Sequence, residues 1–253
     1  VEDVANAQGY SVLLSNTDRT PKKEQKYIET LLDKQVDGLI LADSMVSDSL
    51  ILQIAERPRL AIVVMNRGID SLNVDEIWVD FRGAAIQMTE HLIEAGHRRI
   101  AFVSGPRSVW RAEERLIGYQ EALSRHQIDF DRSLVIHGKF DYQSGYLAGE
   151  ELLQQRDRFT AIFASNDLMA IGCMTALQDN GVSVPDDISI VGFDDIDLAF
   201  FVRPKLSTVY QPNYEMGAAA VRLMMERVQG ERNVKTRQEL ATRLEMRESM
   251  VPR

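Results

Sequence analysis

Short apolar runs alternate with longer helix-favouring segments along almost the whole chain, and this alternation most constrains the fold. The runs predict strands at 10–15, 38–42, 60–65, 77–79, 100–103, 134–137, 160–164, 188–191, 206–210 and 240–246. The segments between most of them carry apolar residues at helical spacing, often between an N-cap and a stopping glycine. Strands that alternate with helices of about 10 to 15 residues indicate βαβ units with right-handed crossovers. The fold class is therefore α/β, with parallel sheets covered by helices on both faces.

The strand pattern and the 253-residue length suit two sheets better than one. The pattern breaks between Asp70 and Phe81, again at 210–212, and near Glu239. We therefore predict two doubly wound parallel-sheet subdomains joined by three crossovers, which could hinge about a shared cleft. The first comprises residues 1–80 and 211–239, and the second comprises residues 81–210 and 240–253.

The first residues resemble the end of a helix, because residues 1–8 favour helix and Gly9 is placed to stop it. In a parallel sheet a strand should come before this helix. We therefore expect that the first strand is missing and that the sequence is a fragment of a longer protein.

Hydrogen-bonding side chains repeatedly follow the predicted strands. They are Asp43 and Ser44, Asn66 and Arg67, Ser165 to Asp167, and Asp194 and Asp195. The carboxyl ends of parallel strands share one edge of a sheet, so these residues should converge on a crevice. Each Asp or Asn could instead be the N-cap of the next helix. Asn166 and Asp194 are the residues that we most expect to face a ligand.

The stretch from Arg99 to Tyr119 shows the same arrangement most fully. A strand is followed by Ser104-Gly105-Pro106 and then by a charged helix that carries Trp110, Arg111 and Arg115. Helix N-termini and free backbone N–H groups converge where such a strand ends. These three side chains should therefore lie at the mouth of a cleft. A solvent-facing helix start with scattered charge is the alternative.

The composition limits the kinds of partner that we expect this chain to contact and the compartment in which we expect it. The net charge is -9 and no Lys/Arg block occurs, which argues against direct contact of these residues with nucleic acid. No apolar run approaches the roughly 18 residues of a membrane span, so we expect no membrane contact. The single cysteine, Cys173, cannot form an internal disulfide and indicates a reduced, cytoplasmic chain. No signal peptide is visible, although Val1 is not a natural start.

Catalysis has little support in the sequence, and we predict no enzyme activity, no metal and no cofactor. The four histidines are dispersed, and no GxSxG, HExxH, CxxC or P-loop string occurs. Asp194, Asp195 and Asp197 could suggest a metal, but no second carboxylate cluster stands at ligand spacing. Asp194 as a general base lacks an evident partner nucleophile.

Five ordered strings resemble the effector-binding core of the lac/galactose/purine repressor family of bacterial transcription regulators. They are DGLIL (37–41), EAGHRRIAFVSGP (94–106), RLIGY (115–119), TAIFASNDLMAIG (160–172) and VPDDISIVGFDD (184–195), and RLEMRES (243–249) resembles the closing strand of that family. The resemblance implies two α/β subdomains joined by three crossovers, each like half of a periplasmic sugar-binding protein. It also implies a preceding helix-turn-helix headpiece and hinge helix, and neither is in this sequence.

The resemblance also implies a set of ligand contacts. They are Arg111, Arg115, Phe140, Asn166, Asp167, Asp194 and Asn66, with Arg19 and Asp43 aligned less securely. From its chemistry, Phe140, assisted by Trp110, offers a face for stacking a sugar ring or a base, although core packing is the alternative role of Phe140. Arg115 can make a planar bidentate contact to a diol, a carboxylate or a phosphate. Arg111 replaces an expected small polar residue, which favours an anionic ligand unless it turns outward to Glu114 or Asp141.

Together these observations predict the effector-binding and dimerisation domain of a transcription regulator. We expect it to bind a sugar, sugar phosphate, sugar acid or purine in the inter-subdomain cleft. Closure would be transmitted to the headpieces, which alone would contact operator DNA, and the protein would be a homodimer. A periplasmic sugar-binding protein of an ABC transporter is the alternative, and an enzyme on this scaffold comes third. The GHRRIAF and VGFDD strings favour the regulator.

Overall fold

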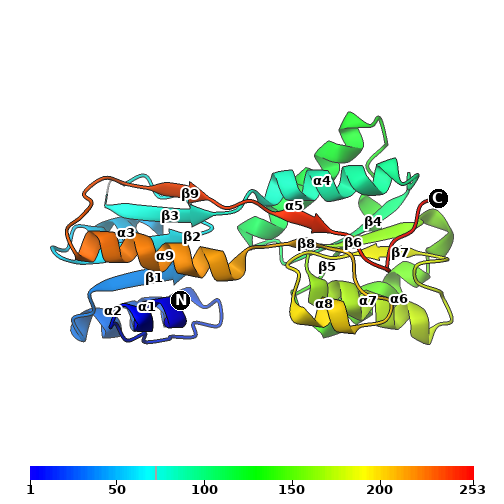
Figure 1. Cartoon of the computed structure of the whole chain (residues 1–253). Helices are drawn as coiled ribbons and strands as arrows, with labels where there is room; N and C mark the ends of the chain where they lie inside the picture. Colours follow the sequence, from blue (N-terminus) through cyan, green and yellow to red (C-terminus); the bar gives the residue numbers. More distant parts are fainter. Residues whose placement is uncertain (72) are drawn as a thin grey trace. The chain divides into compact units, whose positions relative to one another are not determined.

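The computed structural model describes residues 1–71 and 73–253, which form two compact α/β units (Figure 1). The first unit comprises Val1–Val79 and Pro212–Ala241, and the second comprises Asp80–Gln211 and Thr242–Arg253. The chain thus passes between the units after residues 79, 211 and 241. The sequence pattern puts these passages after residues 80, 210 and 239. Each unit is built on its own parallel sheet.

The first unit contains a parallel sheet with the order β1-β2-β3-β9. Its strands are β1 (Gly38–Ala42), β2 (Ala61–Met65), β3 (Val74–Trp78) and β9 (Arg237–Glu239). Its helices are α1 (Glu2–Ala7), α2 (Pro21–Asp33), α3 (Asp48–Ala55) and α9 (Asn213–Val228). Helix α9 packs across β1, β2 and β3. The first four residues of β2 and of β3 are therefore buried, as their continuous apolar sequence predicts for β2.

The strand expected at 10–15 is wrong. This segment is irregular, and the side chain of Leu14 is 93% exposed. A strand needs the hydrogen bonds of a neighbour. In the described sheet the edge strand β1 pairs with β2 alone. The apolar sequence of residues 10–15 favours an extended backbone but supplies no partner.

The second unit contains a parallel sheet with the order β5-β4-β6-β7. Its strands are β4 (Ile100–Ser104), β5 (Val135–His137), β6 (Ala161–Ala164) and β7 (Ser189–Val191). Its helices are α4 (Phe81–Glu94), α5 (Trp110–Arg125), α6 (Tyr142–Leu153), α7 (Asp167–Asp179) and the short α8 (Asp197–Phe201). Helices α4 and α5 pack together on one face of the sheet, and α6 and α7 pack together on the other. All of β4 and β6 is therefore buried.

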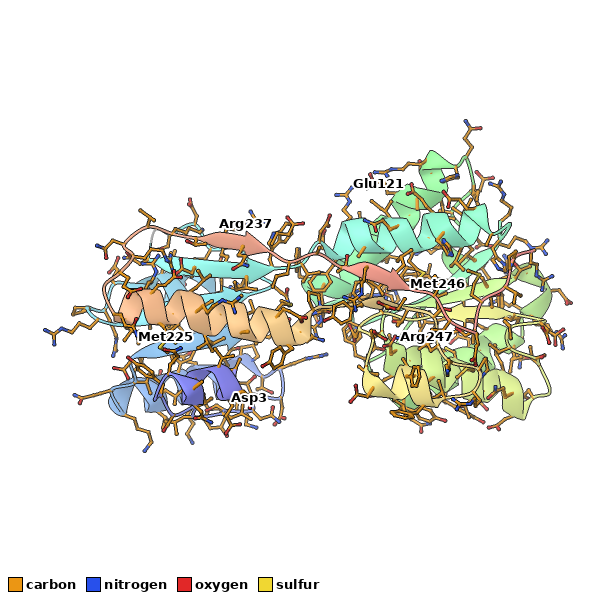
Figure 2. The ribbon with its side chains drawn as sticks, viewed as in Figure 1. Asp3, Glu121, Met225, Arg237, Met246 and Arg247 are labelled. Atoms are coloured by element: carbon orange, nitrogen blue, oxygen red, sulfur yellow. The ribbon has the colours of Figure 1, made fainter. Side chains whose placement is uncertain are left out.

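The closing strand expected at 240–246 is present as the shorter β10 (Arg243–Glu245), and the strand β9, which comes just before that range, was not expected. Strand β9 belongs to the first unit, and β10 pairs antiparallel with β8 (Thr208–Tyr210) of the second. Figure 2 labels Arg237 in β9 and Arg247 just after β10. The third passage between the units separates the two strands, and apolar pattern alone does not show such a passage.

The last residues are fixed to the second unit. The backbone N–H of Ile190 donates to the carbonyl of Ser249 at 2.7 Å. His97 is buried, with Nε2 3.0 Å from the carbonyl of Val251 and Nδ1 2.9 Å from the hydroxyl of Thr160. Burial lowers the pKa of His97, so the ring is neutral at pH 7. Because a carbonyl only accepts, Nε2 carries the proton and donates to Val251.

Candidate ligand-binding site

Arg115 is the centre of the candidate site in the second unit. Its side chain is 1% exposed. Nη1 donates to the carbonyl of Ser165, after β6, at 2.5 Å, and Nη2 is 3.2 Å from Oδ1 of Asp194, after β7. Nη2 also donates to Oε1 of Gln211, after β8, at 3.4 Å. One guanidinium thus connects the carboxyl ends of three strands.

The guanidinium of Arg115 lies over two aromatic rings. Its central carbon lies 3.8 Å from the ring centroid of Phe193 and 4.8 Å from that of Phe81. Stacking on aromatic rings suits the flat, weakly hydrated guanidinium better than it would suit a lysine ammonium. Arg115 is therefore held in one orientation before any ligand arrives.

Asp194 has an unusual backbone. Its φ is +116°, and that of the next residue, Asp195, is +55°. Residues other than glycine rarely adopt such angles, and they persist where the surroundings enforce them. Here the surroundings are a bridge from Asp194 to Tyr210 and an ion pair between Asp195 and Arg247 at 2.5 Å. The Asp194 side chain keeps 25% exposure beside the buried Arg115.

Asp167 lies behind this loop and is fully buried. Its carboxyl accepts from the hydroxyl of Thr208 at 2.5 Å and from the backbone N–H of Ile196 at 2.9 Å. Burial and the nearby charge of Asp194 raise the pKa of Asp167 to about 8. Through these contacts Asp167 supports the loop after β7.

Asn166 caps α7 and also holds the loop that follows β5. Its Oδ1 accepts from the backbone N–H of Met169 at 3.0 Å, and its Nδ2 donates to the carbonyl of Phe140 at 3.2 Å. The N-cap alternative to ligand contact is therefore realised, and one N–H of the amide is used on Phe140. Phe140 itself has a φ of +64°.

The Phe140 ring lies on the backbone that follows β4. A Cβ added at Gly105 would lie 2.2 Å from this ring, so only glycine fits there. The guanidinium of Arg111 lies over the same ring, 5.3 Å from its centroid. Trp110 is half exposed, with its ring 6.0 Å from Phe81 in an edge-on arrangement. Aromatic and cationic groups thus surround the carboxyl end of β4.

In the first unit, Asp43 and Asn66 follow neighbouring strands. Ala42 and Met65 are register partners in β1 and β2, so the two residues leave the sheet at the same level. Their φ angles are +50° and +57°. Oδ1 of Asn66 is buried without a hydrogen-bond partner among the described residues. A buried acceptor of this kind is costly unless a water or a ligand supplies a donor.

A buried carboxylate fixes the loop after β1. Glu24 of α2 accepts from the hydroxyl of Ser44 at 2.5 Å and from the backbone N–H of Met45 at 2.8 Å. Arg67 donates to the carbonyl of Ser44 at 3.1 Å and pairs with Asp48. Arg19 lies in the turn before α2 with a φ of +54°. The loops of this edge are therefore well supported.

The sequence did not identify several members of the second-unit site. The carbonyl of Ser165, the ring of Phe193 and the amide of Gln211 all contact Arg115. Oγ of Ser165 is also buried without a partner among the described residues. A backbone acceptor leaves no mark in a sequence, although the position of Phe193 directly before Asp194 is a usable signal.

No group of three or more His, Cys, Asp or Glu side chains in the described part of the chain is placed to hold a metal ion. Within the same residues, no helix has the length and apolar character needed to cross a membrane.

Comparisons with known proteins agree with this architecture. Residues 89–250 match a family model described as a periplasmic binding protein-like domain. The HTH-type transcriptional repressor PurR of Vibrio atlanticus is 34% identical over 228 residues, which are 90% of this chain and 68% of that protein.

Two solved structures show the same fold. A sugar-binding transcriptional regulator of the LacI family from Escherichia coli, complexed with phosphate, has 32% identity and a TM-score of 0.88, over 99% of this chain and 90% of that one. A LacI family transcriptional regulator from Enterococcus faecium with bound ribose has 28% identity and a TM-score of 0.87, over 100% and 91% of the two chains.

Proposed function

Because the chain belongs to the lac/galactose/purine repressor family, whose members are transcription regulators and not enzymes, we propose that it is the effector-binding and dimerisation domain of such a regulator. The similar proteins are regulators and repressors, which favours this function over the sugar-binding component of an ABC transporter.

The proposed effector is a sugar or a sugar derivative, bound at the carboxyl ends of the strands of the second unit. The observation that carries this proposal is the guanidinium of Arg115, fixed by Ser165, Asp194 and Gln211 and stacked on two rings. A donor group fixed in advance binds a polar ligand with little loss of side-chain entropy. Ribose and phosphate in the two similar structures support this ligand class.

The other proposed contacts follow from their chemistry. In the second unit, Asp194 and the second N–H of Asn166 would bond hydroxyl groups, and Phe140 and Trp110 would face a ring. Asp167 is the last member of the proposed set, and its proposed role is to support the loop after β7 that carries Asp194. The first-unit set, Asn66, Asp43 and Arg19, is proposed to bind the same ligand, and the buried Oδ1 of Asn66 supports it.

The proposal extends to anionic effectors because of Arg111. Its guanidinium lies over the Phe140 ring, beside the loop that Asn166 holds. Two arginines near one edge of a sheet favour a phosphate or a carboxylate on the sugar. Sugar phosphates and sugar acids are therefore the derivatives to test first, with purines as a further class.

Effector binding would act through the two units. A ligand that contacts both favours one arrangement only by its differential affinity, typically about 1 to 3 kcal/mol. We assign DNA contact to a helix-turn-helix headpiece, because the net charge of these 253 residues is -9. A regulator that acts on operator DNA must reach the bacterial chromosome, so the proposed location of the protein is the cytoplasm.

We also propose that the regulator is a homodimer. Helix α8 presents Leu198, Phe200 and Phe201 to solvent, and Phe201 is 70% exposed. Neighbouring exposed aromatic residues are typical of protein–protein contacts rather than of free surface. A second copy of the chain is the proposed occupant of this surface.

A thermal-shift screen against sugars, sugar phosphates, sugar acids and purines would identify the effector, because a ligand of the native state raises its Tm. Calorimetry would then compare Arg115→Lys with Arg132→Lys, which changes an exposed arginine outside the site. We expect Arg115→Lys to weaken binding at least tenfold, since lysine loses the planar contacts, and Arg132→Lys to leave binding unchanged. Wild-type affinity in a folded Arg115→Lys variant would contradict the proposed site.

A further inference from the structure

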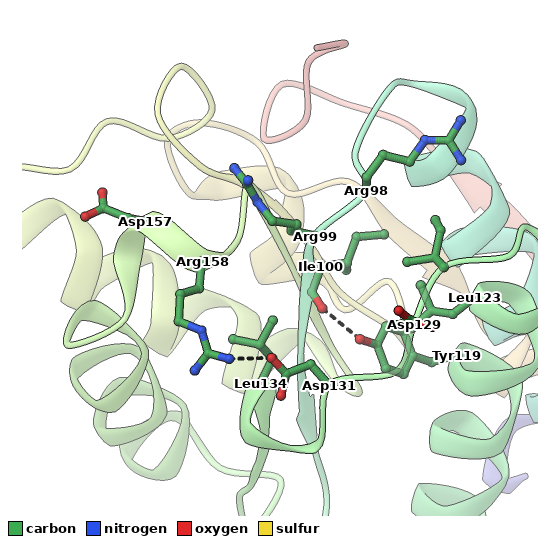
Figure 3. A pocket seen from close by; sticks show the side chains of 11 residues that line it. Arg98, Arg99, Ile100, Tyr119, Leu123, Asp129, Asp131, Leu134, Asp157 and Arg158 are labelled. Atoms are coloured by element: carbon green, nitrogen blue, oxygen red, sulfur yellow. Dashed lines mark hydrogen bonds and ion pairs between the residues drawn. The ribbon is translucent and has the colours of Figure 1, made fainter.

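The guanidinium of Arg115 is covered by its neighbours, because the side chain is only 1% exposed. A hollow of about 490 Å³ does lie in the second unit, at the amino ends of β4 and β6 (Figure 3), but Arg115 does not line it. A ligand therefore reaches Arg115 only if one of the groups around the guanidinium moves away.

The contacts of Arg115 described above differ in their own exposure. The backbone carbonyl and the two aromatic rings belong to buried residues. The other two contacts are the side chains of Asp194 and Gln211, and both residues are partly exposed. Of these contacts, Asp194 and Gln211 are therefore the ones that lie between Arg115 and solvent.

Gln211 is held less firmly on Arg115 than Asp194 is. Asp194 offers a charged carboxylate, and its backbone N–H donates to the carbonyl of Val209 at 2.9 Å. The backbone N–H of Gln211 donates to the carbonyl of Asp194 at 3.3 Å, but its amide oxygen accepts from Nη2 of Arg115 at 3.4 Å. Hydrogen bonds of this kind are usually about 2.9 to 3.0 Å long, so the bond from Arg115 to the amide is weak. Gln211 is the neighbour that a ligand displaces with least loss.

The amide oxygen of Gln211 occupies a position on Nη2 that a ligand oxygen could take. A sugar hydroxyl in its place gives Nη2 another neutral oxygen, so the exchange gains little. A phosphate or carboxylate gives it a charged oxygen, and hydrogen bonds between two charged groups are about twice as strong as neutral ones. The exchange therefore favours an anionic ligand.

We propose that Gln211 is a displaceable cover on Arg115 that selects for anionic effectors. This inference rests on the proposed effector site and adds a specificity-determining residue to it. Removing a residue that bonds the ligand, or that only supports the site, weakens binding. Removing a cover strengthens binding, so the direction of the change distinguishes these roles.

Chemical modification of Arg115 tests the cover without a ligand. Phenylglyoxal modifies accessible guanidiniums, and mass spectrometry follows its reaction at Arg115, with the exposed Arg132 as the reference in the same protein. We expect Gln211→Ala to raise the rate at Arg115 about threefold, because truncation uncovers the guanidinium and removes only a weak hydrogen bond. Gln53→Ala, at an exposed position of α3, should leave the rate unchanged. Equal rates at Arg115 in the wild type and Gln211→Ala would overturn the proposal.

Inorganic phosphate tests the selection in the same assay. Phosphate should protect Arg115 of the wild type from phenylglyoxal, and D-ribose at the same concentration should not. Gln211→Ala should need less phosphate for half protection, and Gln211→Glu should need more, because its carboxylate pairs with Arg115 and repels the anion.

Three results would overturn the selection by Gln211. They are no protection by phosphate, equally strong protection by D-ribose, and a Gln211→Ala variant that needs as much phosphate as the wild type or more. Wild-type effector affinity in Arg115→Lys would instead refute the proposed effector site, and the rates measured without a ligand separate this failure from a failure of the cover.

Discussion

Backbone strain gathers at the residues expected to meet the effector. Ten described residues other than glycine have positive φ angles, and five of them are Arg19, Asp43, Asn66, Phe140 and Asp194. Two others, Gln35 and Gln127, follow the C-caps of α2 and α5, an ordinary place for such angles. Strained residues cluster at ligand sites because the surrounding structure holds them there. The proposed effector contacts therefore lie on backbone that is fixed in advance.

Asp167 provides a prediction about pH. Its pKa is about 8 in the folded chain and near 3.8 in the unfolded one. The folded state therefore binds more protons between these values, and the stabilisation that it gains is lost as pH rises through about 8. Between pH 6 and pH 9 we expect the free energy of unfolding to fall by about 2 kcal/mol more in the wild type than in Asp167→Asn. Urea unfolding at both pH values measures this, and equal slopes would refute it.

At the scale of secondary-structure elements, one buried carboxylate connects β3, α9 and the segment before β9. Asp75 is fully buried and accepts from Arg227 at 2.5 Å, from Arg232 at 2.8 Å, and from the backbone N–H of Thr236 at 2.7 Å. Burial alone would raise the pKa of Asp75, but the hydrogen bonds from Arg232 and Arg227 outweigh it and lower the pKa. Asp75 therefore stays charged and holds these elements together.

Removing this carboxylate should destabilise the first unit. We expect Asp75→Ala to lower its free energy of unfolding by about 3 kcal/mol, because two largely buried guanidiniums lose the buried carboxylate that they share. Glu226→Gln is the control, since this more exposed partner of Arg232 should matter by less than about 1 kcal/mol. The chain has two tryptophans, Trp78 in the first unit and Trp110 in the second, so Trp78 fluorescence in a Trp110→Phe background follows the first unit alone. A loss as small as that of the control would disprove the role of Asp75.

Local pattern explains which elements the sequence could predict. The run at 60–65 became β2 because its own side chains fill both faces of a covered sheet. The run at 10–15 is less apolar, with serine at both 11 and 15, and it has no strand to pair with, because pairing depends on distant residues. Likewise, the position of Arg115 in a helix after a strand indicates a site, whereas its acceptor at Ser165 is a backbone carbonyl. Asp167 and Asp194 both follow strands, and only the fold shows that the first is buried while the second is partly exposed.

At the scale of the whole molecule, three passages of the chain make the two units dependent on one another. The first unit contains α9 and β9, and the second contains β10 and the residues after it, so neither unit is one continuous segment. If the proposed effector contacts both units, its binding is coupled to the binding of operator DNA. This coupling must be reciprocal: the factor by which the effector changes the affinity for DNA is also the factor by which DNA changes the affinity for the effector.

The proposed homodimer gives the prediction at this scale. Phe200→Asp combined with Phe201→Asp should convert a dimer into a monomer, because charges then replace apolar surface on α8. Val234→Asp, at a similarly exposed position in the first unit, should leave the dimer intact. Sedimentation velocity distinguishes these states. An unchanged dimer in the double variant would place the interface elsewhere.

The attachment of the last residues to β7 and His97 has a consequence for biosynthesis. The backbone of Ile190 and the imidazole of His97 acquire their partners at Ser249 and Val251 only after residues 243–253 have left the ribosome exit tunnel. Translation at about 5 to 20 residues per second leaves the nascent second unit without these partners for several seconds. Complete folding of the second unit therefore waits until these last residues are free of the ribosome.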